Sequence, residues 1–268
     1  MMLFFIFIIG LFIGSFLNVL ADRLPREESV VKGRSHCEKC KKTLQWFDLI
    51  PLVSFIFLGG KCRYCRAGLS SYYPIIELTT GILFALTALF VLESPQFLIN
   101  SQFLNFQLLI SLIYYLFIVS SLIVIFFADL KYGIIPDKIL LPAIVITFLY
   151  LFIYHSSLII NNLSSAVGAC LFFLILSLIK IKKHTAMGFG DVKFAFLMGL
   201  ILGFPNIVVS LYIAFLTGAV IGIILVLWEK KKLKGATIPF GPFLVLGTLI
   251  AIFWGKGILH LLSPIFHF

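Results

Sequence analysis

The stretch Met187-Gly188-Phe189-Gly190-Asp191-Val192-Lys193 organises the chain around one acidic side chain. It lies between two strongly apolar segments, residues 163–179 and 194–204. An aspartate with so little bulk water around it indicates a functional role by default. Gly188 and Gly190 permit backbone angles that other residues resist, and they carry no side chain. We therefore expect the backbone here to approach a substrate or a second side chain closely.

The best partner for Asp191 is Asp129, which follows the apolar run 108–128. Two carboxylates that lie close together can hold one proton between them and activate a water molecule. We therefore predict that Asp129 and Asp191 form a dyad of the aspartic-protease type. The alternative is a pair of interfacial carboxylates that only anchor the ends of helices.

The composition excludes a soluble globular domain. Hydrophobic residues make up 61% of the chain, charged residues make up 12%, and the mean hydropathy is +1.13, whereas soluble domains carry roughly 25% charged residues. The net charge of +10 could suggest nucleic acid, but the basic residues lie in short segments between apolar runs, as topology determinants do. We expect an all-α polytopic membrane protein that contacts lipid and binds no nucleic acid.

The apolar runs predict eight transmembrane helices, and the first is read as a retained anchor rather than a cleaved signal peptide. The sixth run is too short for a hydrocarbon core of roughly 30 Å and should be tilted or partly buried in protein. The predicted spans are 3–20, 74–92, 107–128, 138–154, 163–179, 192–204, 207–228 and 240–262. The chain then divides into a first helix (1–20), a polar segment (21–73) and a larger membrane domain (74–268).

Lysine and arginine residues orient these spans. Ten of them lie in segment 21–73, and the others, apart from Lys256, lie in the loops 129–138, 180–193 and 229–239. With eight spans, all these loops are on one side of the membrane, which the positive-inside rule makes cytoplasmic. Asp129 and Asp191 then share the cytoplasmic face, and both termini face outward.

The polar segment contains two C-x-x-C pairs, Cys37 with Cys40 and Cys62 with Cys65. Four thiolates satisfy a tetrahedral zinc ion, and a closed site of this kind is structural. A cytoplasmic location argues against disulfides. The alternatives to a zinc site are then four reduced free thiols or a redox role. The residues 46–55 between the pairs are aromatic and aliphatic, and suit either a segment lying on the bilayer or packing around the zinc site.

The sequence resembles the prepilin peptidases, also called type IV leader peptidases, over nearly its whole length. One departure is Glu38, where the family usually has proline. The motifs that carry the resemblance are Gly14-Ser15-Phe16-Leu17-Asn18-Val19 with Arg23-Leu24-Pro25, the four cysteines around Trp46-Phe47-Asp48-Leu49-Ile50-Pro51, Tyr73-Pro74 with Glu77, Asp129 with Ile135-Pro136-Asp137, Gly188-Phe189-Gly190-Asp191-Val192-Lys193, and Pro239-Phe240-Gly241-Pro242.

The resemblance implies an aspartic endopeptidase of the bacterial cytoplasmic (inner) membrane. Such an enzyme removes the leader peptide from type IV prepilins or pseudopilins on the cytoplasmic side, after a glycine. It also implies a structural zinc ion and, less directly, methylation of the new amino terminus with S-adenosylmethionine. The family associates this second activity with the amino-terminal region, and no separate cofactor motif is visible here.

Several further residues have two interpretations each. Asp137 is expected to cap the fourth span or, alternatively, to take part in the chemistry. Lys193 is expected to be an ordinary basic anchor, or else to orient the loop. Pro239-Phe240-Gly241-Pro242 begins the last helix or receives a substrate strand, and Glu77 supports the zinc segment or serves the methyltransferase. The acidic residues that could line a path for a basic leader are Asp22, Glu27, Glu28, Glu38 and Asp48.

Three rival functions stay open. A transporter also places acids in a helical bundle and uses broken helices near glycines, but it favours acids at mid-membrane and an internal repeat. A G-x-G-D protease with other substrates would share Asp129 and Asp191 but not the cysteine pairs. A non-enzymatic zinc-bearing scaffold would leave both aspartates unexplained.

Overall fold

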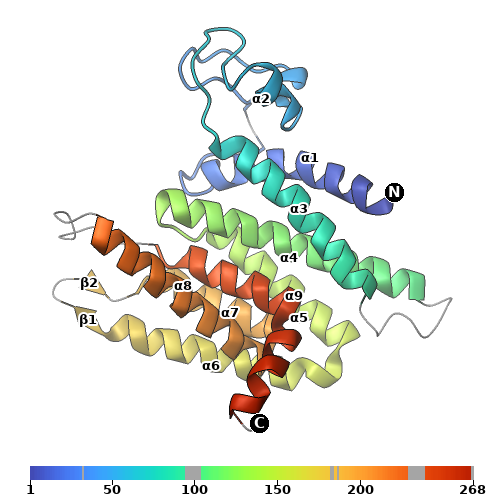
Figure 1. Ribbon diagram of the computed structural model, residues 1–268, viewed down its shortest axis with the longest axis vertical. Coiled ribbons are helices and arrows are strands. Elements are labelled where there is room, and N and C mark those ends of the chain that lie inside the picture. Colours follow the sequence, from blue (N-terminus) through green and yellow to red (C-terminus); the bar gives the residue numbers. More distant parts are fainter. Residues whose placement is uncertain (32, 94–103, 182–183, 186, 229–238, 267–268) are drawn as a thin grey trace. The chain divides into compact units, whose positions relative to one another are not determined.

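The computed structural model describes the chain except residues 32, 94–103, 182–183, 186, 229–238 and 267–268 (Figure 1). It consists of two compact units, Met1–Val124 and Ile125–Phe268. As predicted, the long elements are all helices. A two-residue ladder, β1 (Lys180–Ile181) against β2 (His184–Thr185), is the one sheet in the described part of the chain.

Each of the eight predicted spans corresponds to a helix. These are α1 (Met2–Arg23), α3 (Tyr72–Glu93), α4 (Leu104–Tyr132), α5 (Asp137–Tyr154), α6 (Ile159–Leu178), α7 (Phe189–Leu202), α8 (Asn206–Trp228) and α9 (Gly241–Phe266). Within the described residues, seven of them are long and apolar enough to cross a membrane. The exception is α7, whose 14 residues span only about 21 Å at 1.5 Å per residue.

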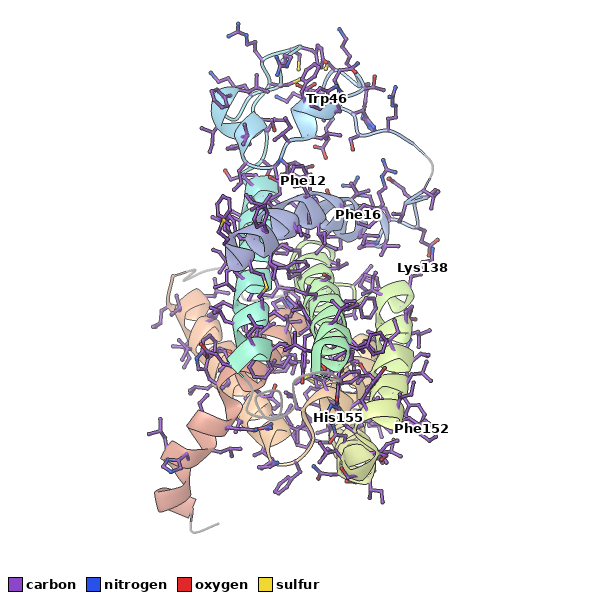
Figure 2. All side chains as sticks on the ribbon, turned by 90° about the vertical axis from the view of Figure 1, so that its right-hand side faces the viewer. Phe12, Phe16, Trp46, Lys138, Phe152 and His155 are labelled. Carbon is purple, nitrogen blue, oxygen red and sulfur yellow. The ribbon has the colours of Figure 1, made fainter. Side chains whose placement is uncertain are left out.

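In the first unit, α1 packs against α3 through glycines. A Cβ atom added to Gly10 would lie 2.8 Å from Cα of Gly81, and one added to Gly14 would lie 2.8 Å from Cα of Glu77. Small residues of this kind let membrane helices approach closely. Phe12 and Phe16 project from α1 and are more than half exposed (Figure 2), as expected for side chains that face lipid.

The polar segment between α1 and α3 contains only short helices among its described residues. They are the 3-10 helix η1 (Trp46–Leu49) and the five-residue helix α2 (Val53–Phe57). A segment so poor in regular structure depends on other interactions for its shape, and a structural metal ion is one that can supply them.

In the second unit, the short helix α7 lies in the interior. Phe194, Leu197 and Met198 are fully buried, so the prediction that this helix is partly buried in protein is confirmed. Its end is held by two amides of α6. Asn162 Nδ2 donates to the Leu200 carbonyl at 2.8 Å, and Asn161 Nδ2 donates to the Phe204 carbonyl at 3.0 Å.

Candidate active site

A cavity of about 270 Å³ in the second unit contains both predicted aspartates. Its walls come from the end of α4, the turn before α5 and the start of α7. The lining residues are Asp129, Gly133, Ile134, Ile135, Asp137, Gly188, Phe189, Gly190, Asp191 and Lys193. Asp129 and Asp191 are only 5% and 8% exposed, and the charge of Asp129 acts on Asp191. The structure therefore brings together two carboxyl groups that lie 62 residues apart in sequence.

Asp129 occupies the last turn of α4. The helix ends where the backbone N–H of Gly133 donates to the Asp129 carbonyl at 2.8 Å, and Gly133 takes a left-handed φ of 66° that favours glycine. The Gly241 backbone N–H approaches the buried Asp129 carboxyl group as a donor, but Oδ2 makes no contact with complete hydrogen-bond geometry among the described residues. An incompletely paired buried oxygen can still bind a proton, a water molecule or a substrate group.

Asp191 lies in the first turn of α7. Its Oδ2 accepts a hydrogen bond from the backbone N–H of Gly188 at 3.3 Å, and its own N–H donates to the Gly188 carbonyl at 3.1 Å. This reciprocal arrangement is a capping box without a capping side chain. It holds the carboxyl group at the start of the helix, where Asp191 lines the cavity.

The two glycines before Asp191 act differently from the prediction. Gly188 has φ −73° and ψ 147°, an extended conformation open to any residue, so the expectation of unusual backbone angles is wrong there. A Cβ atom added to Gly190 would lie 3.3 Å from Cβ of Ile135, which confirms the expected close approach. Gly190 therefore lets the start of α7 pack against the turn that precedes α5.

Gly241, the first residue of α9, packs directly on Asp129. A Cβ atom at this position would lie 2.5 Å from Oδ2 and 3.0 Å from Cγ of that carboxyl group. The Phe240 carbonyl accepts backbone hydrogen bonds from Phe243 and Leu244. The motif Pro239-Phe240-Gly241-Pro242 therefore begins the last helix, which was one of its two predicted roles. The contact with Asp129 was not foreseen, although the motif itself was.

Asp137 and Lys193 form an ion pair at the cavity. Lys193 Nζ donates to both carboxylate oxygens of Asp137, at 2.9 and 2.8 Å. Asp137 is the first residue of α5, and the N-cap position is taken by Pro136. The prediction that Asp137 caps this helix is therefore wrong. The pair joins the start of α5 to the start of α7. Lys193 is therefore more than the basic anchor that was expected, because it links two helices at the cavity.

The four cysteines of the first unit converge. Their Sγ atoms all lie within 4.8 Å of one another, and those of Cys37 and Cys65 are 3.8 Å apart. A tetrahedral zinc site with Zn–S bonds of about 2.3 Å has S···S edges of about 3.8 Å. The backbone N–H of Cys40 lowers the pKa of the Cys37 thiol to about 6, although burial opposes this. The thiolate form, which a metal requires, is thereby favoured at Cys37. At Cys65 the Ala67 backbone N–H lowers the pKa, but burial and the neighbouring thiols outweigh it and raise the pKa to about 11.

The two cysteine pairs form matching turns. Cys37 N–H donates to the Lys42 carbonyl and Lys41 N–H donates to the Cys37 carbonyl; Cys62, Ala67 and Arg66 repeat both bonds. Lys41 and Arg66 both have φ 58°, a left-handed angle usually reserved for glycine. The sequence shows no glycine at these positions, so the repeated geometry could not be read from it.

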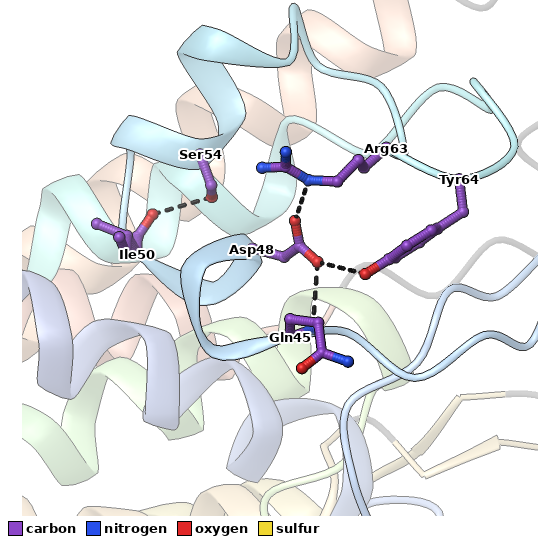
Figure 3. Close-up of polar contacts among 6 residues, drawn as sticks. All are labelled: Gln45, Asp48, Ile50, Ser54, Arg63 and Tyr64. Atoms are coloured by element: carbon purple, nitrogen blue, oxygen red, sulfur yellow. Dashed lines mark hydrogen bonds and ion pairs between the residues drawn. The ribbon is translucent and has the colours of Figure 1, made fainter.

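An acidic side chain links η1 to the second cysteine turn (Figure 3). Asp48 accepts hydrogen bonds from Arg63 Nε at 2.7 Å, Tyr64 Oη at 3.2 Å and the Gln45 backbone N–H at 3.1 Å. Burial raises the pKa of Asp48, but these bonds outweigh it and hold the pKa below its usual value. The Asp48 side chain is 3% exposed, so the expectation that it lines a path for a basic leader is wrong.

Two family models match separate parts of the chain. The bacterial peptidase A24 N-terminal domain matches residues 8–91, which include all four paired cysteines. The type IV leader peptidase family matches residues 116–223, which include both aspartates. No solved structure matches the chain with significance.

Several curated relatives share one name, prepilin leader peptidase/N-methyltransferase. The protein of Bacillus subtilis is 30% identical over 262 residues, which cover 96% of each chain. Those of Legionella pneumophila and Pseudomonas aeruginosa are 30% and 28% identical, with 94% of this chain and 92% and 90% of the relatives covered. The cavity with its two aspartates and the four-cysteine cluster thus lie in a chain that belongs to the type IV leader peptidase family.

Proposed function

We propose that this protein cuts the leader peptide from type IV prepilins or pseudopilins, after a glycine and on the cytoplasmic side of the inner membrane. The observation that carries the proposal is the shared cavity of Asp129 and Asp191. The names of its relatives supply the substrate class. The cytoplasmic location rests on the distribution of lysine and arginine along the chain.

In the proposed reaction, Asp129 and Asp191 act as one unit. Like charges held close together in a buried site cannot both ionise comfortably, so the pair holds one proton. The ionised partner takes a proton from water, which attacks the scissile carbonyl carbon, while the protonated partner donates a hydrogen bond to the carbonyl oxygen. The proton taken from water then goes to the leaving amine as the C–N bond breaks. The shared proton belongs to the pair rather than to either residue.

The surroundings support this use of the pair. Gly188 N–H holds Asp191, whereas Oδ2 of Asp129 makes no hydrogen bond of complete geometry among the described residues and can accept one in the reaction. Gly190 and Ile135, which both line the cavity, pack closely against each other, and an extended substrate backbone without a bulky side chain suits such a site best. A glycine before the cut has this property. The Asp137–Lys193 pair then holds the two walls of the cavity together.

We further propose that the four cysteines bind a structural zinc ion. The set offers four sulfur ligands within 4.8 Å of one another, and four protein ligands leave no open coordination position for catalysis. When bound, the ion supplies cross-linking and charge neutralisation. Cys37 and Cys62 are buried whereas Cys40 and Cys65 are exposed, so each turn presents one inner and one outer ligand.

N-methylation of the new amino terminus, with S-adenosylmethionine as donor, is the second proposed activity. It rests on the shared name of the relatives. A transporter is less well supported, because both aspartates lie at the ends of helices rather than in the middle of the bundle.

The test is co-expression of the protein with a prepilin, followed by the gel shift of the leader. We expect cleavage by the wild type and none by Asp191→Asn, while Glu93→Gln, the same carboxyl-to-amide change at an exposed position at the end of α3, retains it. Mass spectrometry of the product would show whether the new amino terminus carries a methyl group. An intact prepilin and intact pseudopilins in the presence of inserted wild type would contradict the proposal.

A further inference from the structure

An apolar face is exposed on the segment that carries the cysteines. Its members come from η1 and α2: Trp46, Leu49, Val53, Ile56 and Phe57, with exposures of 76%, 41%, 46%, 73% and 86%. Figure 2 shows Trp46 on this segment. Val53, Ile56 and Phe57 lie three and four residues apart, so they share one side of α2, and exposed apolar side chains gathered in this way mark an interaction surface. We refer to these five residues as the apolar face.

A hydrogen bond to α3 fixes the position of the apolar face along the axis of that helix. Oε2 of Glu77 accepts a hydrogen bond from the Leu52 backbone N–H at 2.9 Å. Glu77 is the sixth residue of α3, so the bond lies about 7.5 Å along the helix from its first residue, at 1.5 Å per residue. Val53, the first residue of α2, follows Leu52 directly. The apolar face is therefore tied to a membrane helix beyond its first turn.

The backbone at Leu52, next to this hydrogen bond, has a strained conformation. Leu52 has φ 59° and ψ −46°, and the Val53 N–H meets the Pro51 carbonyl at 2.5 Å. These values describe a γ-turn of the rare, strained type. Such strain persists only where surrounding contacts hold it, and the Glu77 bond is one of them. The turn redirects the chain so that α2 starts at the level of Glu77.

Basic residues flank the face on both sides in sequence. Segment 21–73 contains ten Lys and Arg residues and five Asp and Glu residues, and none of the ten lies between Lys42 and Lys61. Aromatic side chains next to lysine and arginine are typical of segments that lie in the headgroup layer of a membrane. Basic segments beside a membrane helix are also attracted to anionic lipid. This charge distribution complements an anionic bilayer.

We propose that η1 and α2 insert their apolar face into the headgroup layer of a bilayer that contains anionic lipid, at a depth fixed by the Glu77–Leu52 hydrogen bond. The bilayer is the favoured occupant because it already surrounds α1 and α3, which precede and follow the segment. This inference does not depend on the peptidase reaction.

Tryptophan fluorescence in nanodiscs tests the proposal. The reporter is Phe57→Trp in the full chain, with the three natural tryptophans, Trp46, Trp228 and Trp254, changed to phenylalanine. The matched control is Glu38→Trp in the same background, because residue 38 is exposed in the first cysteine turn. Each protein is loaded with zinc and placed in lipid that carries bromine on the upper acyl chain, or in the same lipid without bromine.

We expect bromine to reduce the emission of the Phe57→Trp protein by about half or more, because interfacial helices place their apolar side chains about 5–10 Å into the boundary layer. The control should change little. Replacing phosphatidylglycerol by phosphatidylcholine should weaken the quenching at position 57. Equal quenching at positions 57 and 38, or blue-shifted emission at 57 without quenching, would overturn the proposal. The second result would indicate a protein surface as the occupant.

Discussion

Substituting Gly241 by alanine should disable the proposed dyad without unfolding the protein. The new Cβ atom would lie 2.5 Å from Oδ2 of Asp129, whereas an ordinary contact needs at least 3.4 Å. The carboxyl group or α9 must therefore move by 0.9 Å, which is 3.4 minus 2.5. A misplacement of about 1 Å at a reacting group can lower the rate about 100-fold. We expect a loss of this size in kcat/KM for leader cleavage.

The assay is cleavage of a purified prepilin in nanodiscs, with thermal unfolding measured on the same samples. Gly257→Ala is the matched control, because it adds the same methyl group to the same helix at a position with nothing within 4 Å. The control should keep wild-type kinetics. Wild-type kcat/KM in Gly241→Ala would refute the reasoning, because it would mean that the carboxyl group can move this far without consequence. A melting temperature far below that of Gly257→Ala would point instead to loss of the fold.

Three further changes have definite expected outcomes. Lys193→Met should lower the rate of cleavage about tenfold, because the two walls of the cavity are no longer joined by the ion pair. The free energy of unfolding should fall by less than about 1 kcal/mol, because the ion pair is largely exposed. Adding Asp137→Asn should lower the cleavage rate little further, and losses that multiply in the double variant would show that the two residues act separately. Cys62→Ser should abolish zinc binding as measured by metal analysis of the purified protein, and full zinc content would contradict the four-cysteine site. Asp48→Asn should destabilise the segment by about 1–3 kcal/mol, as expected for hydrogen bonds to a charged group. The pKa of Asp48 is depressed in the folded state. The stability that ionised Asp48 contributes is therefore fully present above its unfolded pKa of about 3.9, and it is lost as the pH falls through the lower folded pKa. The difference in melting temperature between Asp48→Asn and wild type should thus stay constant between about pH 5 and 8, and a difference that changes across this range would contradict the assignment to Asp48 and its bonds with Arg63.

Seven of the helices were predictable because their apolar runs are long and are bounded by polar or glycine-rich residues. The short helix α7 was also foreseen, since 14 residues cannot cross a bilayer and must be covered by protein. The convergence of the cysteines followed from their spacing, because two C-x-x-C turns can present four sulfurs to one ion. These features depend on local sequence or on ligand chemistry alone.

The contacts that shape the cavity could not be predicted in the same way. Asp137 and Lys193 lie 56 residues apart, and nothing in the local sequence distinguishes an ion pair from a cap and a basic anchor. The approach of Gly241 to Asp129 depends on how α9 packs against α4. Likewise, the left-handed angles of Lys41 and Arg66 arise from the cysteine turns rather than from residue preference. Tertiary packing decides all of these.

The central claim is that Asp129 and Asp191 act as one catalytic unit, and a mutant cycle tests it most directly. Leader cleavage would be measured for Asp129→Asn, Asp191→Asn and the double variant, each purified, folded and loaded with zinc. Residues that act as a unit have non-additive effects. The account predicts that each single variant loses at least about a thousandfold in rate and that the double variant is no worse. Substantial cleavage by either single variant, or losses that multiply in the double variant, would contradict it.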